Sequence, residues 1–122
     1  MNKITWLMLI AACLPFVATI CAKAMGKGFD NSNPRPWLAG LEGWRGRANA
    51  AQANLFEGLP FFYAAVLFAL YKQADIALIT NLMLAWVVIR IAFVATYIAG
   101  YGAVRSLLWF SALVVNIVIL FA

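Results

Sequence analysis

The sequence predicts an all-α membrane protein, folded as an up-and-down bundle of four transmembrane helices. Hydrophobic residues make up 66% of its 122 residues and charged residues only 11%, whereas a soluble domain carries about 25% charged and about 45–50% apolar residues. Such a composition cannot cover a surface exposed to water. At about 20 apolar residues per span, the chain has room for four spans and short connections. We therefore expect one domain, residues 1–122, and no large soluble catalytic domain.

The first expected span is the uncharged run of residues 4–22, which is long enough to cross the hydrocarbon core. Pro15 lies inside it, and membrane helices tolerate an internal proline. Lys3 before the run resembles the start of a signal peptide, but the run exceeds the usual length of about 7–15 apolar residues. Cys13 and Cys21 lie too far apart along this helix to pair with each other, so we expect free thiols.

A polar connection at residues 23–47 follows the first span and is rich in Gly, Asn and Pro, which favour turns. Trp37 and Trp44 within it suit the headgroup layer, where an indole ring has one apolar and one hydrated side. The remaining connections are short, so consecutive helices must be antiparallel neighbours. The three further spans are expected at residues 48–71, 74–99 and 103–122.

The distribution of basic residues predicts the orientation of the bundle. The net charge is +5, but most basic residues flank apolar runs, so we expect no nucleic acid as a partner. Six basic residues fall on the side of the first and third connections and two on the opposite side, which places those connections in the cytoplasm. A short chain without an organelle address suits a bacterial inner membrane. The six are Lys23, Lys27, Arg35, Arg45, Arg47 and Arg105, and the two are Lys3 and Lys72.

The chain contains no histidine. It therefore lacks the commonest general base and the usual ligand of zinc and haem. We expect no metal site and no Ser-His chemistry. The residue types left to carry a function are Arg, Glu, Asp, Tyr, Cys, Asn and Ser.

Two ionisable residues interrupt the expected spans, Glu57 in the second and Arg90 in the third. Each costs a few kcal/mol at the centre of a membrane helix, so each needs a partner or a hydrated cavity. Glu57 precedes the hairpin at residues 71–75 by 14 residues and Arg90 follows it by 15. At about 1.5 Å per residue, both lie roughly 21–22 Å from the turn. We expect an ion pair between them in a crevice open to the cytoplasm.

Other polar residues continue from this pair toward the cytoplasmic end at helical spacings. A single polar pair is enough to join two membrane helices, at roughly 0.6–2 kcal/mol per side chain. The accumulation of polar residues at one end favours a ligand site instead. Guanidinium groups clamp carboxylates and a glutamate accepts from an ammonium group, so this mixture suits a small zwitterion such as glutathione. The group comprises Asn54, Glu57, Arg90, Tyr97, Tyr101 and Arg105.

Two blocks of the sequence resemble the MAPEG family, the membrane-associated proteins in eicosanoid and glutathione metabolism, in its bacterial-type members. The first block, RANAAQANLFEGLP, is similar to the family's signature on its second helix. The likeness covers nearly the whole chain. The matching residues are Arg47, Ala48, Ala51, Asn54, Glu57 and Pro60 in the first block, and Arg90, Tyr97, Gly100, Tyr101, Arg105, Ser106 and Trp109 in the second.

The resemblance implies a homotrimer that binds glutathione between neighbouring subunits near the cytoplasmic face. It implies glutathione S-transferase or peroxidase activity toward a hydrophobic electrophile arriving from membrane lipid. It assigns Arg105 to stabilising the glutathione thiolate. Lowering a thiol pKa from about 8.5 to about 6.5 takes roughly 2.7 kcal/mol, within reach of a partly buried guanidinium. The glutathione contacts it assigns are Asn54, Glu57, Arg90, Tyr97, Tyr101 and Arg47.

Two departures from the family pattern keep another function open. Ala50 stands where several eicosanoid-processing members carry an arginine that helps to hold glutathione, and Trp109 replaces a tyrosine of some relatives. The alternative is a non-enzymatic trimer that binds lipid or scaffolds other membrane proteins, because the fold does not by itself establish an activity. A proton-coupled exporter using Glu57 ranks last, since Arg90 at the same depth would keep that carboxylate charged.

Overall fold

The computed structural model describes residues 1–24 and 26–122, and helices make up nearly all of this part of the chain. Four of the helices are long and apolar enough to cross a membrane, so the protein is an integral, multi-pass membrane protein with an all-α fold. The long helices are α1 (Asn2–Lys23), α3 (Gly43–Tyr71), α4 (Ile76–Ala99) and α5 (Gly102–Phe121), and a short helix, α2 (Pro34–Ala39), lies between the first two.

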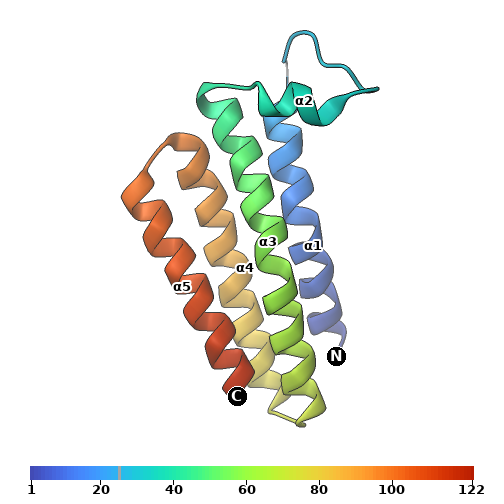
Figure 1. Cartoon of the computed structure of the whole chain (residues 1–122). Coiled ribbons are helices and arrows are strands. Elements are labelled where there is room, and N and C mark those ends of the chain that lie inside the picture. The colour runs from blue at the N-terminus through green and yellow to red at the C-terminus, as the bar shows by residue number, and fades with distance from the viewer. Residues whose placement is uncertain (25) are drawn as a thin grey trace.

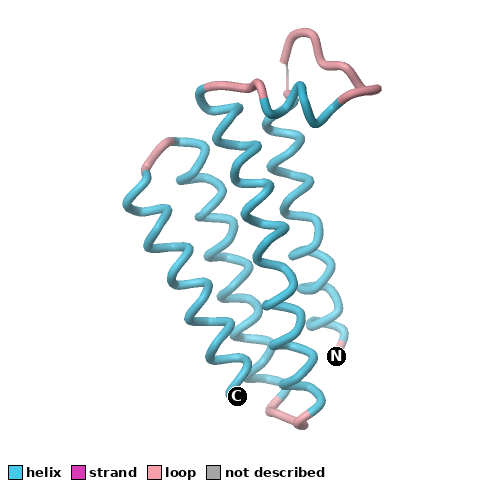
Figure 2. Tube along the Cα trace, viewed as in Figure 1, coloured by secondary structure: helices cyan, strands magenta, loops and turns pink. Residues whose placement is uncertain are grey.

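The four long helices form the up-and-down bundle that the sequence predicts (Figure 1). Helix α3 packs against α1, α4 and α5, and α1 and α5 each also contact α4. Both termini and the α3–α4 turn lie at one end of the bundle, and α2 and the α4–α5 turn lie at the other (Figure 2). The basic connections therefore share one end, as the charge count requires.

The first connection is more helical than its composition indicates. Helix α3 begins at Gly43, five residues before the expected start at residue 48, so Arg45 and Arg47 lie on its first turns. A hydropathy boundary marks where the chain leaves the lipid, whereas a helix satisfies its own backbone and can continue into water. Pro34 starts α2, because a proline at the first helical position loses no hydrogen bond.

Side chains and backbone close this connection over the end of the bundle. The Trp37 indole Nε1 donates to the carbonyl of Lys27 at 3.1 Å, and its ring packs edge-on against Phe29. Arg45 donates through Nε and Nη2 to the carbonyl of Ala24 at 3.3 and 2.8 Å. Because Ala24 follows α1 directly, these bonds hold the start of α3 beside the end of α1.

Small residues form the contact between α1 and α3. Ala18 and Ala22 on α1 are fully buried, as are Ala51 and Ala65 on α3. In a membrane, where lipid is as apolar as the helices, association depends on such close backbone approach and on interhelical hydrogen bonds. One such bond crosses this contact, since the Tyr63 hydroxyl donates to the Met8 carbonyl at 2.7 Å.

Removing the Tyr63 hydroxyl tests this bond. We expect Tyr63→Phe to lower the free energy of unfolding in detergent by about 1 kcal/mol, the usual net value of one hydrogen bond. Unfolding by titration with a denaturing detergent measures the change. The matched control is Tyr71→Phe, whose side chain is 83% exposed and whose substitution should leave stability unchanged. Equal stability of the two variants would contradict the assigned role.

Candidate functional site

Arg90 is the centre of the polar group at the α3–α4 contact, where its side chain is only 2% exposed. Its Nη2 donates to the backbone carbonyl of Asn54 at 3.0 Å and to the side-chain Oδ1 of the same residue at 3.2 Å. The guanidinium also lies 4.7 Å from the ring centroid of Phe93 and 5.5 Å from that of Trp86. Amide oxygens and aromatic faces thus surround the positive charge within the bundle.

Gly58 makes this approach of Arg90 to α3 possible. A Cβ atom at Gly58 would lie 2.9 Å from Arg90 Nη2, too close for an undisturbed contact. Gly58 follows Asn54 by one turn and shares its helix face. The guanidinium therefore occupies the space left by the missing Cβ of Gly58 and bonds to Asn54 one turn before it.

The expected ion pair between Glu57 and Arg90 is wrong. Among residues 1–24 and 26–122, no acidic oxygen lies within 4.0 Å of a basic nitrogen, and Glu57 is exposed. Both residues line one cavity, which agrees with their expected equal depth. Residue counting gives depth along a helix, but Glu57 is turned by about 100° from Gly58 around α3. Its carboxylate therefore lies beside α5, and Arg90 bonds to Asn54 instead.

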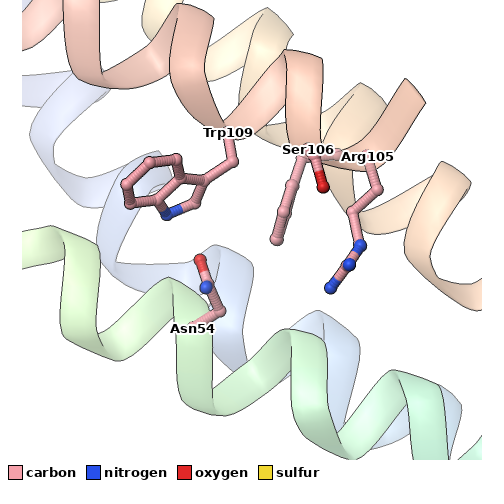
Figure 3. Close-up of a pocket in the computed structure, with 5 residues that line it drawn as sticks. Asn54, Arg105, Ser106 and Trp109 are labelled. Carbon is pink, nitrogen blue, oxygen red and sulfur yellow. The ribbon is translucent and has the colours of Figure 1, made fainter. Parts of the chain in front are cut away.

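A recess of about 200 Å³ opens between α3 and α5. It lies between Arg90 and the end of the bundle that carries the α4–α5 turn. Asn54 borders it from α3, and Arg105, Ser106 and Trp109 border it from α5 (Figure 3). The Asn54 amide and the Arg105 guanidinium point into the space between the two helices. Phe93 completes the lining from α4. We call this space the α3–α5 recess.

A second recess, of about 240 Å³, lies at the α4–α5 turn, and we call it the turn recess. Arg47, Tyr97 and Tyr101 line it together with Arg105, which therefore borders both recesses. The Arg105 guanidinium lies 4.6 Å from the ring centroid of Tyr97. Arg47 Nε donates to the carbonyl of Ile98 at 3.0 Å, which links the start of α3 to the end of α4.

Gly100 shapes the turn that carries these residues. It has a φ of 89°, in the left-handed region that favours glycine, and it ends α4. The N–H groups of Gly100 and Tyr101 both donate to the Thr96 carbonyl at 3.0 Å. The chain then reverses at once, so that Tyr101 precedes α5 and Arg105 lies on its first turn.

The two recesses share one sign of charge. Arg47 and Arg105 border them, and no aspartate or glutamate is among the described residues that line either one. This arrangement attracts anions such as carboxylates or a thiolate. Among residues 1–24 and 26–122, no group of three or more Cys, Asp or Glu side chains is placed to hold a metal ion.

The predicted site residues thus fall into three places. Asn54 and Arg105 border the α3–α5 recess, and Arg47, Tyr97 and Tyr101 the turn recess. Arg90, which donates to Asn54, and Glu57 both line a third cavity between α3, α4 and α5. Ser106 and Trp109 stand in the second sequence block without an assigned role, and Phe93 carries no polar signal. Their positions on the lining depend on how α4 and α5 pack.

Comparison with known proteins gives the class to which this bundle belongs. The profile of the MAPEG family matches residues 4–122, nearly the whole chain, so the protein belongs to the MAPEG family. Members of this family generally bind glutathione. No curated protein and no solved structure matches the chain.

The bond between Arg47 and Ile98 gives a test of how the turn recess is held. We expect Arg47→Met to speed amide hydrogen exchange at residues 99–105, because the α4–α5 turn loses its link to α3 while the apolar stem of the side chain is kept. Mass spectrometry of exchanging peptides in detergent measures the effect. Arg35→Met is the matched control, since Arg35 is exposed on α2. Unchanged exchange in Arg47→Met would show that the bond does not hold the turn.

Proposed function

We propose that this protein is a membrane glutathione S-transferase or glutathione peroxidase acting on hydrophobic electrophiles. The observation that carries the proposal is the position of Arg105. It borders both the α3–α5 recess and the turn recess, and the described lining of both contains no acid. In a family whose members generally bind glutathione, such a place suits the carboxylates and the thiolate of that peptide.

The chemistry requires the glutathione thiol to lose its proton. A nearby guanidinium favours the anion, and a shift of the thiol pKa from about 8.5 to about 6.5 corresponds to roughly 2.7 kcal/mol. The half-buried Arg105, held against the Tyr97 ring, is the proposed source of this preference. The thiolate sulfur then forms a bond to the electrophilic atom as the leaving group departs with the electron pair, and the thiol proton passes to water.

A hydrophobic second substrate can approach along α5. Leu107 and Phe110, which flank the recess-lining residues of that helix, are 65% and 57% exposed. Exposed apolar side chains on a membrane helix face lipid or a neighbouring subunit. We propose that the electrophile reaches the thiolate along this face, with Trp109 as the aromatic wall between recess and bilayer.

We further propose a homotrimer in which neighbouring subunits complete the site. Glu57 is exposed on a spanning helix, and a membrane carboxylate requires a partner. The ammonium group of glutathione, held beside an adjoining subunit, would supply one. Six basic residues lie at the end of the bundle that carries α2 and the α4–α5 turn, and they favour a cytoplasmic position for that end. The proposed location is a bacterial inner membrane.

Ala50 favours a second candidate function. This half-buried residue of α3 provides no guanidinium where several eicosanoid-processing relatives carry one. The candidate is a non-enzymatic trimer that binds lipid or scaffolds other membrane proteins. Glu57 and Arg90 form no ion pair, so Arg90 gives no reason against a proton-coupled exporter. Such an exporter ranks last because the protein belongs to the MAPEG family.

The thiolate tests the proposed role of Arg105. Mixing the wild-type protein with glutathione at neutral pH should produce thiolate absorbance in the ultraviolet, followed by conjugation of a general electrophile. In Arg105→Leu, both signals should be lost, because without the cation the thiol pKa returns toward about 8.5. Arg35→Leu should behave as wild type. Lipid-bound wild-type protein that gives neither signal and no heat on titration with glutathione would favour the non-enzymatic candidate.

A comparison of two ligands tests Glu57. Removing the ammonium group from glutathione should weaken binding to wild-type protein by about tenfold, the value of one charge-assisted hydrogen bond. The same change in ligand should have little effect on Glu57→Gln, since the interaction is already absent. Isothermal titration measures the four affinities, with Glu42→Gln as the control outside the spans. An equal loss in wild type and Glu57→Gln would exclude contact between this carboxylate and the ammonium group.

A further inference from the structure

A groove of about 700 Å³ lies between the start of α1 and the start of α4, at the opposite end of the bundle from the two recesses (Figure 1). Asn2 and Lys3 border it from α1, and Ala77, Thr80 and Asn81 border it from α4. We call it the α1–α4 groove. None of these side chains belongs to the proposed glutathione site, so the groove needs an explanation of its own.

Two opposite charges lie at the groove without pairing with each other. Lys3 is part of its lining, and the Oδ1 atom of Asp75 accepts from the N–H of the lining residue Ala77 at 3.0 Å. Both charged side chains are exposed, so an occupant of the groove can reach them. Among residues 1–24 and 26–122, no acidic oxygen lies within 4.0 Å of a basic nitrogen. The groove is therefore complementary to a group that carries both a negative and a positive charge.

The polar lining also continues into the spanning part of α4. Asn81 follows Asp75 by six residues, which places it about 9 Å further along the helix. Its side chain is exposed, and an amide at this depth in a membrane requires a hydrogen-bond partner. Next to it, the Thr80 hydroxyl already donates to the Ile76 carbonyl at 2.7 Å. The Asn81 amide is thus the donor that the groove offers below its charged rim.

Beyond these polar residues, both helices present apolar side chains along the same faces. On α4, Leu84 and Val88 follow Asn81 by three and seven residues and are 50% and 57% exposed. On α1, Trp6 and Ile10 follow Asn2 by four and eight residues and are also exposed. The groove therefore passes from a charged rim through an amide to apolar surface, which is the order of groups along a phospholipid.

We propose that the α1–α4 groove binds a glycerophospholipid with an ethanolamine head. The Lys3 ammonium donates to the phosphate, and the ethanolamine ammonium donates to the Asp75 carboxylate. The Asn81 amide donates to an ester carbonyl deeper in the groove, and the acyl chains follow the apolar faces of α1 and α4. A choline head has no N–H donor for Asp75, and a glycerol head has no cation. This site is independent of glutathione binding.

Lipids that differ only in their heads test the two charges. We expect purified protein in detergent to bind phosphatidylethanolamine about tenfold more tightly than phosphatidylcholine or phosphatidylglycerol with the same acyl chains, the value of one charge-assisted hydrogen bond. Native mass spectrometry during lipid titration measures the affinities. Asp75→Asn keeps an oxygen to cap Ala77 but should remove the preference for ethanolamine. Lys3→Met should weaken all three lipids by a similar factor, because all three contain the phosphate.

Lys72→Met is the matched control at the same end of the bundle. The Lys72 Nζ atom donates to the Leu120 carbonyl at 2.9 Å, so its loss should leave the three affinities unchanged. Equal affinity of the wild-type protein for the three lipids, or a preference for ethanolamine that persists in Asp75→Asn, would overturn the proposal.

The acyl chains and Asn81 give a second test, which separates a lipid from other occupants. Glycerophosphoethanolamine, the same head without acyl chains, should bind at least tenfold more weakly than the intact lipid. Asn81→Leu should weaken the intact lipid several-fold. Glycerophosphoethanolamine that binds as tightly as the lipid would assign the groove to a soluble phosphoester instead. An Asn81→Leu variant with altered oligomeric mass and unchanged lipid affinity would assign it to contact with a second copy of the chain. Either result would overturn the lipid site.

Discussion

The bundle depends on how one buried cation is satisfied in an apolar environment. Arg90 is only 2% exposed, and its guanidinium donates to the two oxygens of Asn54 on the neighbouring helix. This contact fixes the rotation of α4 relative to α3 and requires the open space at Gly58. The same contact holds the Asn54 side chain at the edge of the α3–α5 recess. The Arg90–Asn54 contact therefore both provides hydrogen bonds for a buried cation and positions a side chain of the candidate site.

Charged side chains are distributed unevenly along the bundle, so its basic end and its membrane-spanning part favour different ligands. The basic end carries the recesses bordered by Arg47 and Arg105, where anions are favoured, and it is closed by α2. Deeper in the membrane, Glu57, Arg90 and Asn116 surround a cavity with mixed polar character. The remaining surface is mostly apolar, which suits lipid or another subunit. A hydrophobic electrophile and a water-soluble peptide can thus meet at the boundary between these regions, as the proposed reaction requires.

Much of the candidate site is predictable from residue spacing, because helices make depth a linear function of sequence. Counting from the α3–α4 turn placed Asn54, Tyr97 and Arg105 toward one end, and the recesses contain them. The same counting failed for the pair of Glu57 and Arg90, because a residue's direction around a helix depends on how that helix is rotated in the bundle. The extension of α3 to Gly43 was missed for a related reason: a helix satisfies its own backbone and does not stop where hydropathy falls.

Composition and the length of the apolar runs are enough to predict a membrane protein of four antiparallel helices, because a helix satisfies its own backbone hydrogen bonds in lipid. Its two motif blocks also indicated the MAPEG family. The folded structure alone shows that Arg90 bonds to Asn54 and not to Glu57, and that Arg90 and Asn116 line one cavity. These facts depend on side-chain direction and helix rotation, which follow from packing between distant segments rather than from the order of residues along any one of them.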